Sequence, residues 1–264
     1  MINYVERQMI KVNVQGKDYD MTYMELNQSS KKDLIVSHGS FYNANGMLDL
    51  AKYFKEDYHV IVPDLPGHYN KPDQAVDNFD LFVEIYKTFI EALVSNGVIK
   101  EKPYMAGWSL GGSLTLALAT KGVLGKAIIL DGDSKWTEGT IPPFDNDDAL
   151  YQGVYNLLEA ASVGADPEYT KVLQNDMPEY LVDYQTANKD LTMDYALDIR
   201  EELKKIDVPV ILVLGTLDFL TVISKQQELE AAIKDTTLIV IEGGTHMVCA
   251  DRPEVVAKEL LNVL

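Results

Sequence analysis

The stretch GWSLGG, residues 107–112, decides the fold because it joins a short apolar run at residues 104–106 to a helix expected at residues 110–119. A sharp strand-to-helix turn lifts a serine oxygen clear of the backbone, and glycines two residues before and after the serine relieve the crowding. The helix that follows presents its first amide groups to negative charge forming at that oxygen. The stretch therefore predicts that Ser109 is a nucleophile at the end of a strand.

Short apolar runs alternate with segments of helical periodicity over most of the chain. The runs, at residues 34–36, 60–62, 104–106, 127–130, 210–214 and 238–241, have the length and composition of strands covered on both faces. Apolar residues at helical spacing occupy residues 44–54, 78–95, 110–119, 221–233 and 253–263. This alternation predicts an α/β fold with a mostly parallel sheet and helices on both faces. Residues 9–26, split by Gly16, predict an antiparallel hairpin at one edge.

One segment, residues 134–200, breaks this alternation because it contains no short run of β type. It holds 13 acids and 4 bases, a net charge of −9 out of −18 for the chain, and six of the 15 tyrosines. Apolar residues at helical spacing occur at 150–158 and again at 180–184. We predict a helical cap, inserted after the sixth strand into a core made of residues 1–133 and 201–264. The alternative is an acidic helical face on the outside of the fold.

Composition narrows the classes of partner. The 264 residues are 47% hydrophobic, enough to form a core, and acids exceed bases by 41 to 23. Nucleic acids and anionic membrane surfaces attract basic proteins, so we expect neither as a partner. Glu6 and Arg7 stand where a signal peptide needs an apolar stretch, and no apolar run approaches the roughly 20 residues of a membrane-spanning helix. Because the lone Cys249 allows no internal disulfide, we expect a soluble, cytoplasmic protein.

A nucleophilic serine needs a base and an acid that orients the base. Of the four histidines, His246 directly follows the last predicted strand, at the edge of a parallel sheet where active sites form, and we expect it to be the base. Asp218 follows the strand at residues 210–214 and completes the chain order serine, aspartate, histidine. Asp131 and Asp133 also follow a strand, and Asp131 is the stronger rival for the role of this acid.

The other histidines and the remaining motifs predict no metal and no cofactor. His38 is expected to brace its loop and His59 to be structural, while His68 lies in a turn that could reach the site but falls outside the expected chain order. No cluster of histidines and carboxylates has the spacing of metal ligands. Ser113 stands where a phosphate loop needs lysine, and no GxGxxG motif opens a helix after the first parallel strand.

Negative charge that develops on a carbonyl oxygen needs two amide donors. The residue after the nucleophile supplies the first, the N–H of Leu110. The second is expected from the loop after the third strand, with the Ser40 amide as first candidate and the Phe41 amide as second. Gly39 permits the close approach of backbone that such a donor requires.

Together these segments resemble the α/β-hydrolase fold superfamily over residues 30–264. The resemblance rests on the strand and HG loop at 34–41, the DLPGH turn at 64–68, GWSLGG at 107–112, LGTLD at 214–218 and GGTHM at 243–247. GWSLGG is similar to the motif of bacterial carboxylesterases that act on small acyl esters. The resemblance implies an eight-stranded, mostly parallel sheet, a Ser-His-Asp triad, no cofactor and a cap inserted after strand six.

Departures from family patterns narrow the expected activity. Ser109 stands where epoxide hydrolases and haloalkane dehalogenases have aspartate, HGSFY replaces the HGGPG loop of proline iminopeptidases, and His68 stands where many relatives have glycine. We expect a serine hydrolase that cleaves a small carboxylic ester or lactone through an acyl-enzyme. The alternatives left open are a small-molecule receptor that keeps the triad but turns over slowly, and a cofactor-free C–C hydrolase or lyase.

Overall fold

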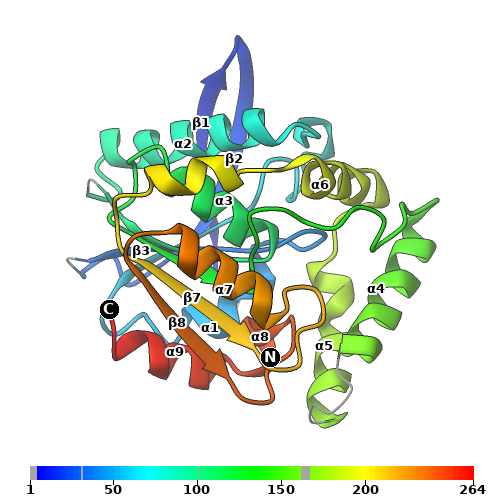
Figure 1. Ribbon diagram of the computed structural model, residues 1–264. Helices are drawn as coiled ribbons and strands as arrows, with labels where there is room; N and C mark the ends of the chain where they lie inside the picture. Colours follow the sequence, from blue (N-terminus) through cyan, green and yellow to red (C-terminus); the bar gives the residue numbers. More distant parts are fainter. Residues whose placement is uncertain (1–4, 31, 101, 162–166) are drawn as a thin grey trace.

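The computed structural model describes residues 5–30, 32–100, 102–161 and 167–264 (Figure 1). Its strands are β1 (Arg7–Val14), β2 (Lys17–Leu26), β3 (Asp33–Ser37), β4 (His59–Pro63), β5 (Tyr104–Trp108), β6 (Lys126–Leu130), β7 (Val210–Gly215) and β8 (Thr236–Ile241). Its α-helices are α1 (Leu48–Ala51), α2 (Phe79–Ser95), α3 (Leu110–Ala119), α4 (Asp147–Ala161), α5 (Pro167–Tyr180), α6 (Tyr184–Ala196), α7 (Ile223–Ala232), α8 (Val248–Asp251) and α9 (Pro253–Leu261). Short 3-10 turns are η1 (Ala44–Met47), η2 (Pro72–Gln74) and η3 (Arg200–Lys205).

The strands form one eight-stranded sheet in the order β1-β2-β4-β3-β5-β6-β7-β8. The strands from β4 to β8 pair in parallel, while β1 pairs antiparallel with β2 and β2 antiparallel with β4. This confirms the predicted mostly parallel sheet with a hairpin at one edge. Because all the parallel strands end at one edge, the loops after β3, β5, β6, β7 and β8 meet there.

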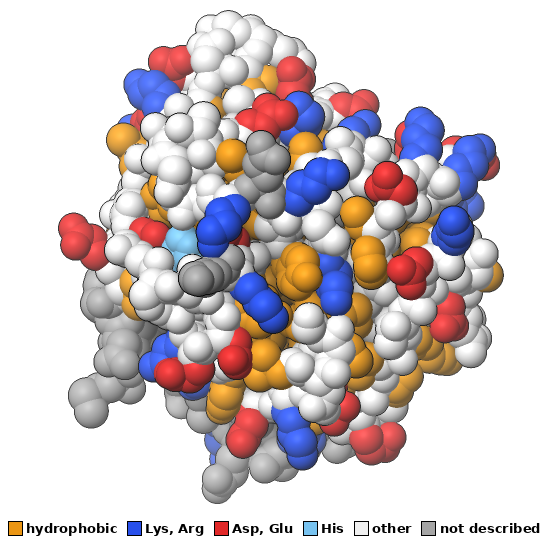
Figure 2. Space-filling view, turned by 90° about the vertical axis from the view of Figure 1, so that its left-hand side faces the viewer, with side chains coloured by type: hydrophobic (Ala, Val, Ile, Leu, Met, Phe, Trp, Pro, Cys, Tyr) orange, Lys and Arg blue, Asp and Glu red, His pale blue; other side chains and the backbone are white. Residues whose placement is uncertain are grey.

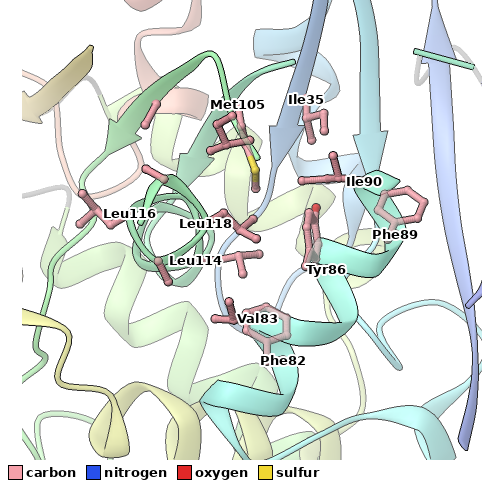
Figure 3. Close-up of a cluster of buried hydrophobic side chains, with 14 of the residues drawn as sticks. Ile35, Phe82, Val83, Tyr86, Phe89, Ile90, Met105, Leu114, Leu116 and Leu118 are labelled. Atoms are coloured by element: carbon pink, nitrogen blue, oxygen red, sulfur yellow. The ribbon is translucent and has the colours of Figure 1, made fainter. Parts of the chain in front are cut away.

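Helices cover both faces of the sheet, as predicted. Alternate side chains of each parallel strand point to opposite faces, so that Ile35 packs under α2 and α3 whereas Leu34 and Val36 pack under α1 and α9. Figure 3 shows the first of these layers, with Ile35 and Met105 of the sheet above apolar side chains of α2 and α3. Asn78 caps the start of α2 by accepting the N–H of Leu81, which begins this helix at the predicted place.

The structure differs from the sequence-based expectation in two helical segments. Residues 44–54 form the turn η1 and the four-residue helix α1 in place of one longer helix, because Tyr53 and Phe54 donate to carbonyls three residues back and tighten the chain. Residues 180–184 are not one helix: Tyr180 ends α5, Tyr184 begins α6, and residues 181–183 form the junction between them. There Leu181 pairs with Tyr42 in an isolated antiparallel bridge, and Asp183 caps α6.

Helices α4, α5 and α6 lie between β6 and β7 in the chain. Figure 1 shows α4 and α5 on the side toward which the arrowheads of β7 and β8 point, so these helices stand beside the edge where the parallel strands end. Within the described residues, no helix is both long enough and apolar enough to cross a lipid bilayer. On the face shown in Figure 2, acidic and basic side chains are interspersed around a central group of hydrophobic ones.

Candidate functional site

Ser109 occupies the sharp turn between β5 and α3. Its backbone has φ +54° and ψ −119°, a strained conformation for a residue that is not glycine. A Cβ atom on Gly107 would lie 1.9 Å from the carbonyl oxygen of Gly111, and a Cβ on Gly111 would lie 2.4 Å from that of His38. Both glycines are therefore required by backbone that passes too close for any side chain, which is the reason the sequence has them.

His246 connects Ser109 to Asp218. The His246 Nε2 atom lies 3.1 Å from Ser109 Oγ, and Nδ1 lies 2.9 Å from Asp218 Oδ2. A carboxylate at Nδ1 fixes the proton on that nitrogen and leaves the lone pair of Nε2 facing the serine hydroxyl. The structure thus brings together the three side chains predicted from the loops after β5, β7 and β8, in the geometry that proton transfer from Ser109 to His246 requires.

The carboxylate of Asp218 is held by its own loop as well as by His246. Oδ1 accepts the N–H groups of Leu220 (2.7 Å) and Thr221 (3.0 Å), and Oδ2 accepts the hydroxyl of Thr221. Burial raises the pKa of this carboxyl, but the interactions with His246 and Thr221 outweigh burial and bring the net pKa below the ordinary value. Asp218 is therefore ionised at neutral pH and can stabilise a positive charge on His246.

The rival acids make other contacts. Asp131 Oδ1 accepts the N–H of Gly215 at 3.0 Å, and burial together with the nearby Asp218 carboxylate raises the pKa of Asp131 well above its ordinary value, which favours the neutral carboxyl. Asp133 accepts the N–H of Ser134 at 2.7 Å and the ammonium group of Lys225 at 2.6 Å. Neither carboxyl hydrogen-bonds His246, so that of these three candidate acids the structure brings only Asp218 to the base.

The three predicted amide donors are not equivalent in the structure. Among the described residues, the N–H groups of Ser40 and Leu110 have no acceptor, and Leu110 begins α3. The N–H of Phe41, the second candidate in its loop, instead donates to Asp190 Oδ2 at 2.8 Å. Phe41 is thus engaged with a side chain of α6, and we retain Ser40 and Leu110 as the candidate donors.

The remaining histidines make structural contacts, His38 and His68 near the site and His59 at the start of β4. Burial, with the His68 ring nearby, lowers the pKa of His38 well below its ordinary value, and this neutral ring donates to the Gly39 carbonyl (2.8 Å) and accepts the N–H of Leu65 (3.0 Å). His59 sits at the start of β4 between Asp33 and Glu25, at 2.8 and 2.7 Å. His68 reaches Asp190 of α6 at 3.0 Å. Within the described ranges, no group of three or more His, Cys, Asp or Glu side chains is arranged to hold a metal ion.

Two tryptophans enclose the base, a feature that the motif analysis did not find. Trp108 donates its indole N–H to the backbone carbonyl of His246 at 2.6 Å. The rings of Trp108 and Trp136 lie 5.9 and 6.0 Å from the imidazole, between ring centres. His246 itself is only 6% exposed, so its ring is held and shielded by aromatic surface. The position of Trp108 inside GWSLGG was the available sequence signal.

A cavity of about 220 Å³ opens over Ser109 and His246. Its walls are mostly aliphatic and aromatic side chains, including Val154, Leu157 and Leu158 of α4 and Leu191 of α6. Apart from His246, Asp194 and the tyrosines are the titratable groups on these walls among the described residues. The site can therefore accept an uncharged, apolar group beside the nucleophile.

Known proteins share this sequence pattern and this fold. Monoacylglycerol lipase ABHD6 of Mus musculus is 21% identical over 281 residues, covering 94% of this chain and 80% of that protein. Pimeloyl-(acyl-carrier protein) methyl ester esterase of Neisseria meningitidis is 26% identical over 236 residues, covering 81% of this chain and 86% of that protein.

Solved structures give the same result for the fold. A lipase-esterase related protein from Clostridium acetobutylicum superposes with a TM-score of 0.77 at 23% identity, covering 92% of this chain and 99% of that one. The enol-lactonase from Burkholderia xenovorans superposes with a TM-score of 0.78 at 16% identity, covering 96% and 98%. The sequence pattern of the Alpha/beta hydrolase family matches residues 34–259. The chain therefore belongs to the alpha/beta hydrolase family and is an esterase-like hydrolase.

Proposed function

We propose that this protein is a serine hydrolase that cleaves a small carboxylic ester or lactone through an acyl-enzyme. The observation that supports this most strongly is the position of His246, which contacts Ser109 Oγ through one ring nitrogen and Asp218 through the other. Among the described residues, the N–H groups of Ser40 and Leu110 have no acceptor and are free to bind an oxyanion. The cavity above Ser109 is mostly apolar.

In the first half of the proposed reaction, Ser109 Oγ attacks the carbonyl carbon while His246 Nε2 takes the hydroxyl proton. The carbonyl oxygen becomes an oxyanion, which accepts hydrogen bonds from the N–H groups of Ser40 and Leu110 and is stabilised by the N-terminal dipole of α3. Asp218 keeps accepting the hydrogen bond from His246 Nδ1–H and stabilises the imidazolium, but the proton stays on His246.

In the second half, His246 returns its proton to the leaving oxygen, which departs as an alcohol and leaves Ser109 acylated. A water molecule then gives a proton to His246 and attacks the acyl carbon. The second tetrahedral intermediate expels Ser109 Oγ, which regains its proton, and the acid is released. The net reaction converts one ester and one water into an acid and an alcohol; a lactone gives a single hydroxy acid.

The substrate class follows from the walls of the cavity. We propose that residues 134–200 act as a cap, because α4 and α6 line the cavity and leave it mostly apolar. The net charge of −9 over these residues disfavours anionic substrates such as acyl-CoA. The similarity to a monoacylglycerol lipase and to a methyl ester esterase supports an ester substrate. The net charge of −18 further supports a protein that binds neither nucleic acids nor anionic membrane surfaces. The lone, buried Cys249 is compatible with a cytoplasmic location.

Turnover of p-nitrophenyl esters with acyl chains from acetyl to dodecanoyl tests this proposal. We expect kcat/KM to rise with chain length while the acyl group fills the cavity and to fall once the group is too large for it. The Ser109→Ala protein is the control and should show no turnover above the rate of the uncatalysed reaction. Equal hydrolysis by both proteins, or no hydrolysis of any ester or lactone by the wild type, would contradict the proposal.

A further inference from the structure

One face of α6 contacts two consecutive residues of the loop that carries the candidate Ser40 donor. The N–H of Phe41 donates to Asp190 Oδ2 at 2.8 Å, and the Ser40 hydroxyl donates to Asp194 Oδ2 at 2.7 Å. Asp190 and Asp194 are four residues apart, so they lie on the same side of the helix, one turn from each other. The two carboxyl groups thus bind the loop as a pair, from a helix that lies outside the sheet.

Phe41 has a strained backbone that α6 and its neighbours hold in place. Its φ is +72°, a conformation that is strained for a residue with a side chain and that persists only where surrounding contacts impose it. The Phe41 carbonyl accepts the N–H of Val182 at 2.9 Å, and its ring packs edge-on against Phe144, with centres 5.6 Å apart. The N–H, the carbonyl and the ring of Phe41 all contact residues between β6 and β7.

The buried pair of His68 and Asp190 connects α6 to the turn after β4. His68 Nε2 lies 3.0 Å from Asp190 Oδ2, and His68 Nδ1 lies 3.1 Å from the Pro66 carbonyl. Burial lowers the pKa of His68, but the Asp190 carboxylate outweighs burial and leaves the net pKa raised. Acceptors lie at both ring nitrogens, an arrangement that favours the protonated form of His68, which can donate to both. Removing one partner of a buried ion pair is costly, so this pair keeps α6 seated on the turn after β4.

Asp194 contacts Ser40 without placing a full charge in the apolar cavity. Burial raises the pKa of this carboxyl to about 8, and the nearby Asp190 carboxylate also raises it, against the hydrogen bond from Ser40. At neutral pH the group is therefore mostly protonated, and its Oδ2 accepts the Ser40 hydroxyl. A neutral carboxyl on the wall of the cavity agrees with an uncharged substrate.

We propose that Asp190 and Asp194 are positioning residues that hold the oxyanion-binding loop in its competent form, so that the hole exists only while α6 is seated on the core. Ser40 lies between two anchored residues of the loop. On one side His38 accepts the N–H of Leu65, and on the other Phe41 donates its N–H to Asp190 of α6. If α6 moves away, Phe41 loses the acceptor that maintains its strained conformation, and Ser40 can turn its N–H from the serine. This inference rests on the proposed hydrolase function, in which that N–H stabilises the oxyanion.

The test compares Asp190→Ala with Lys189→Met. Lys189 is the matched control because it also ties α6 to the core, donating from its ammonium group to the Ala75 carbonyl at 2.9 Å. Among the described residues, it forms no hydrogen bond with the loop. We expect Asp190→Ala to lower kcat for a p-nitrophenyl ester by about 10- to 100-fold with KM changed less than about threefold, since the loss falls on transition-state charge. Lys189→Met should change both constants less than about threefold. Asp190→Asn, which keeps an acceptor for Phe41 but removes the charge that faces His68, should recover part of the loss.

Hydrogen exchange of the peptide that contains residues 38–43 gives a readout independent of activity. Exchange should become faster in Asp190→Ala and stay near wild type in Lys189→Met. If no ester is hydrolysed by the wild type, the proposed function fails, and this exchange result alone decides whether α6 holds the loop. The inference is overturned if both variants lose activity equally, if only KM changes, or if exchange in the loop is unaltered.

Should Asp190→Ala not fold, Ser40→Ala removes only the contact with Asp194 and is expected to lower kcat about 3- to 10-fold; an unchanged kcat would overturn the inference.

Discussion

His246→Ala should lower kcat for a short p-nitrophenyl ester by about 10⁴- to 10⁶-fold, because the variant loses the base that takes the Ser109 proton in the proposed reaction. His246 Nε2 is the nitrogen 3.1 Å from Ser109 Oγ, and within the described part of the chain no second base contacts this hydroxyl. KM should change far less than kcat, since the cavity walls remain and the substrate gains its binding energy from them. Steady-state kinetics with circular dichroism as a check on folding measures the effect.

His59→Gln is the matched control for this prediction. His59 is also a buried histidine between carboxylates, but it contacts Asp33 and Glu25 and not the candidate site. We expect its replacement to lower stability and to leave kcat within about threefold of wild type, because loss of a buried pair affects folding rather than the reaction. A His246→Ala protein that keeps more than about one per cent of the wild-type kcat would show that His246 is not the base.

Asp218→Asn should lower kcat by about 10⁴-fold, whereas Asp131→Asn should change it less than about threefold. Asparagine at 218 cannot hold the Nδ1 proton as a carboxylate does, so the imidazole adopts the wrong tautomer and its positive form loses its counter-charge. Asparagine at 131 replaces a carboxyl whose neutral form is favoured by the raised pKa, and its oxygen can still accept the N–H of Gly215. The two variants therefore separate two buried acids that both follow strands of the sheet.

Kinetics of both variants at neutral pH checks this pair of expectations. Because each substitution preserves shape, differences in folding should be small, and thermal melting measures them. A large loss in Asp131→Asn with near-normal activity in Asp218→Asn would reverse the assignment of the acid. Equal losses in both would mean that the two carboxyls act as one coupled pair.

The sharp turn at Ser109, between β5 and α3, could be predicted from the sequence because the steric limits that produce it are local. Ser109 needs a positive φ, and the backbone passes so close to residues 107 and 111 that only glycine fits there. The short apolar runs likewise predicted the parallel strands, since buried strands require such runs wherever they lie. Local sterics and local burial therefore account for the sheet and for the position of the nucleophile.

The choice between Asp218 and Asp131 could be ranked but not decided from the sequence. Both residues follow apolar strands, and the difference lies in which partner the folded chain brings to each carboxyl, His246 in one case and the Gly215 amide in the other. The engagement of Phe41 by Asp190 depends likewise on residues 149 positions apart. The two acids at 190 and 194, one turn apart beside the apolar Leu191, were the only sequence signal for it.

Covalent labelling with a fluorophosphonate, followed by mass mapping of the modified peptide, tests most directly whether Ser109 is the nucleophile. The reagent phosphonylates a serine whose hydroxyl is activated by a base. We predict one adduct per chain, on the peptide that contains Ser109, with no labelling of Ser109→Ala and greatly slowed labelling of His246→Ala. An adduct on another residue, or wild-type protein that stays unmodified while a known serine esterase in the same tube reacts, would contradict the account.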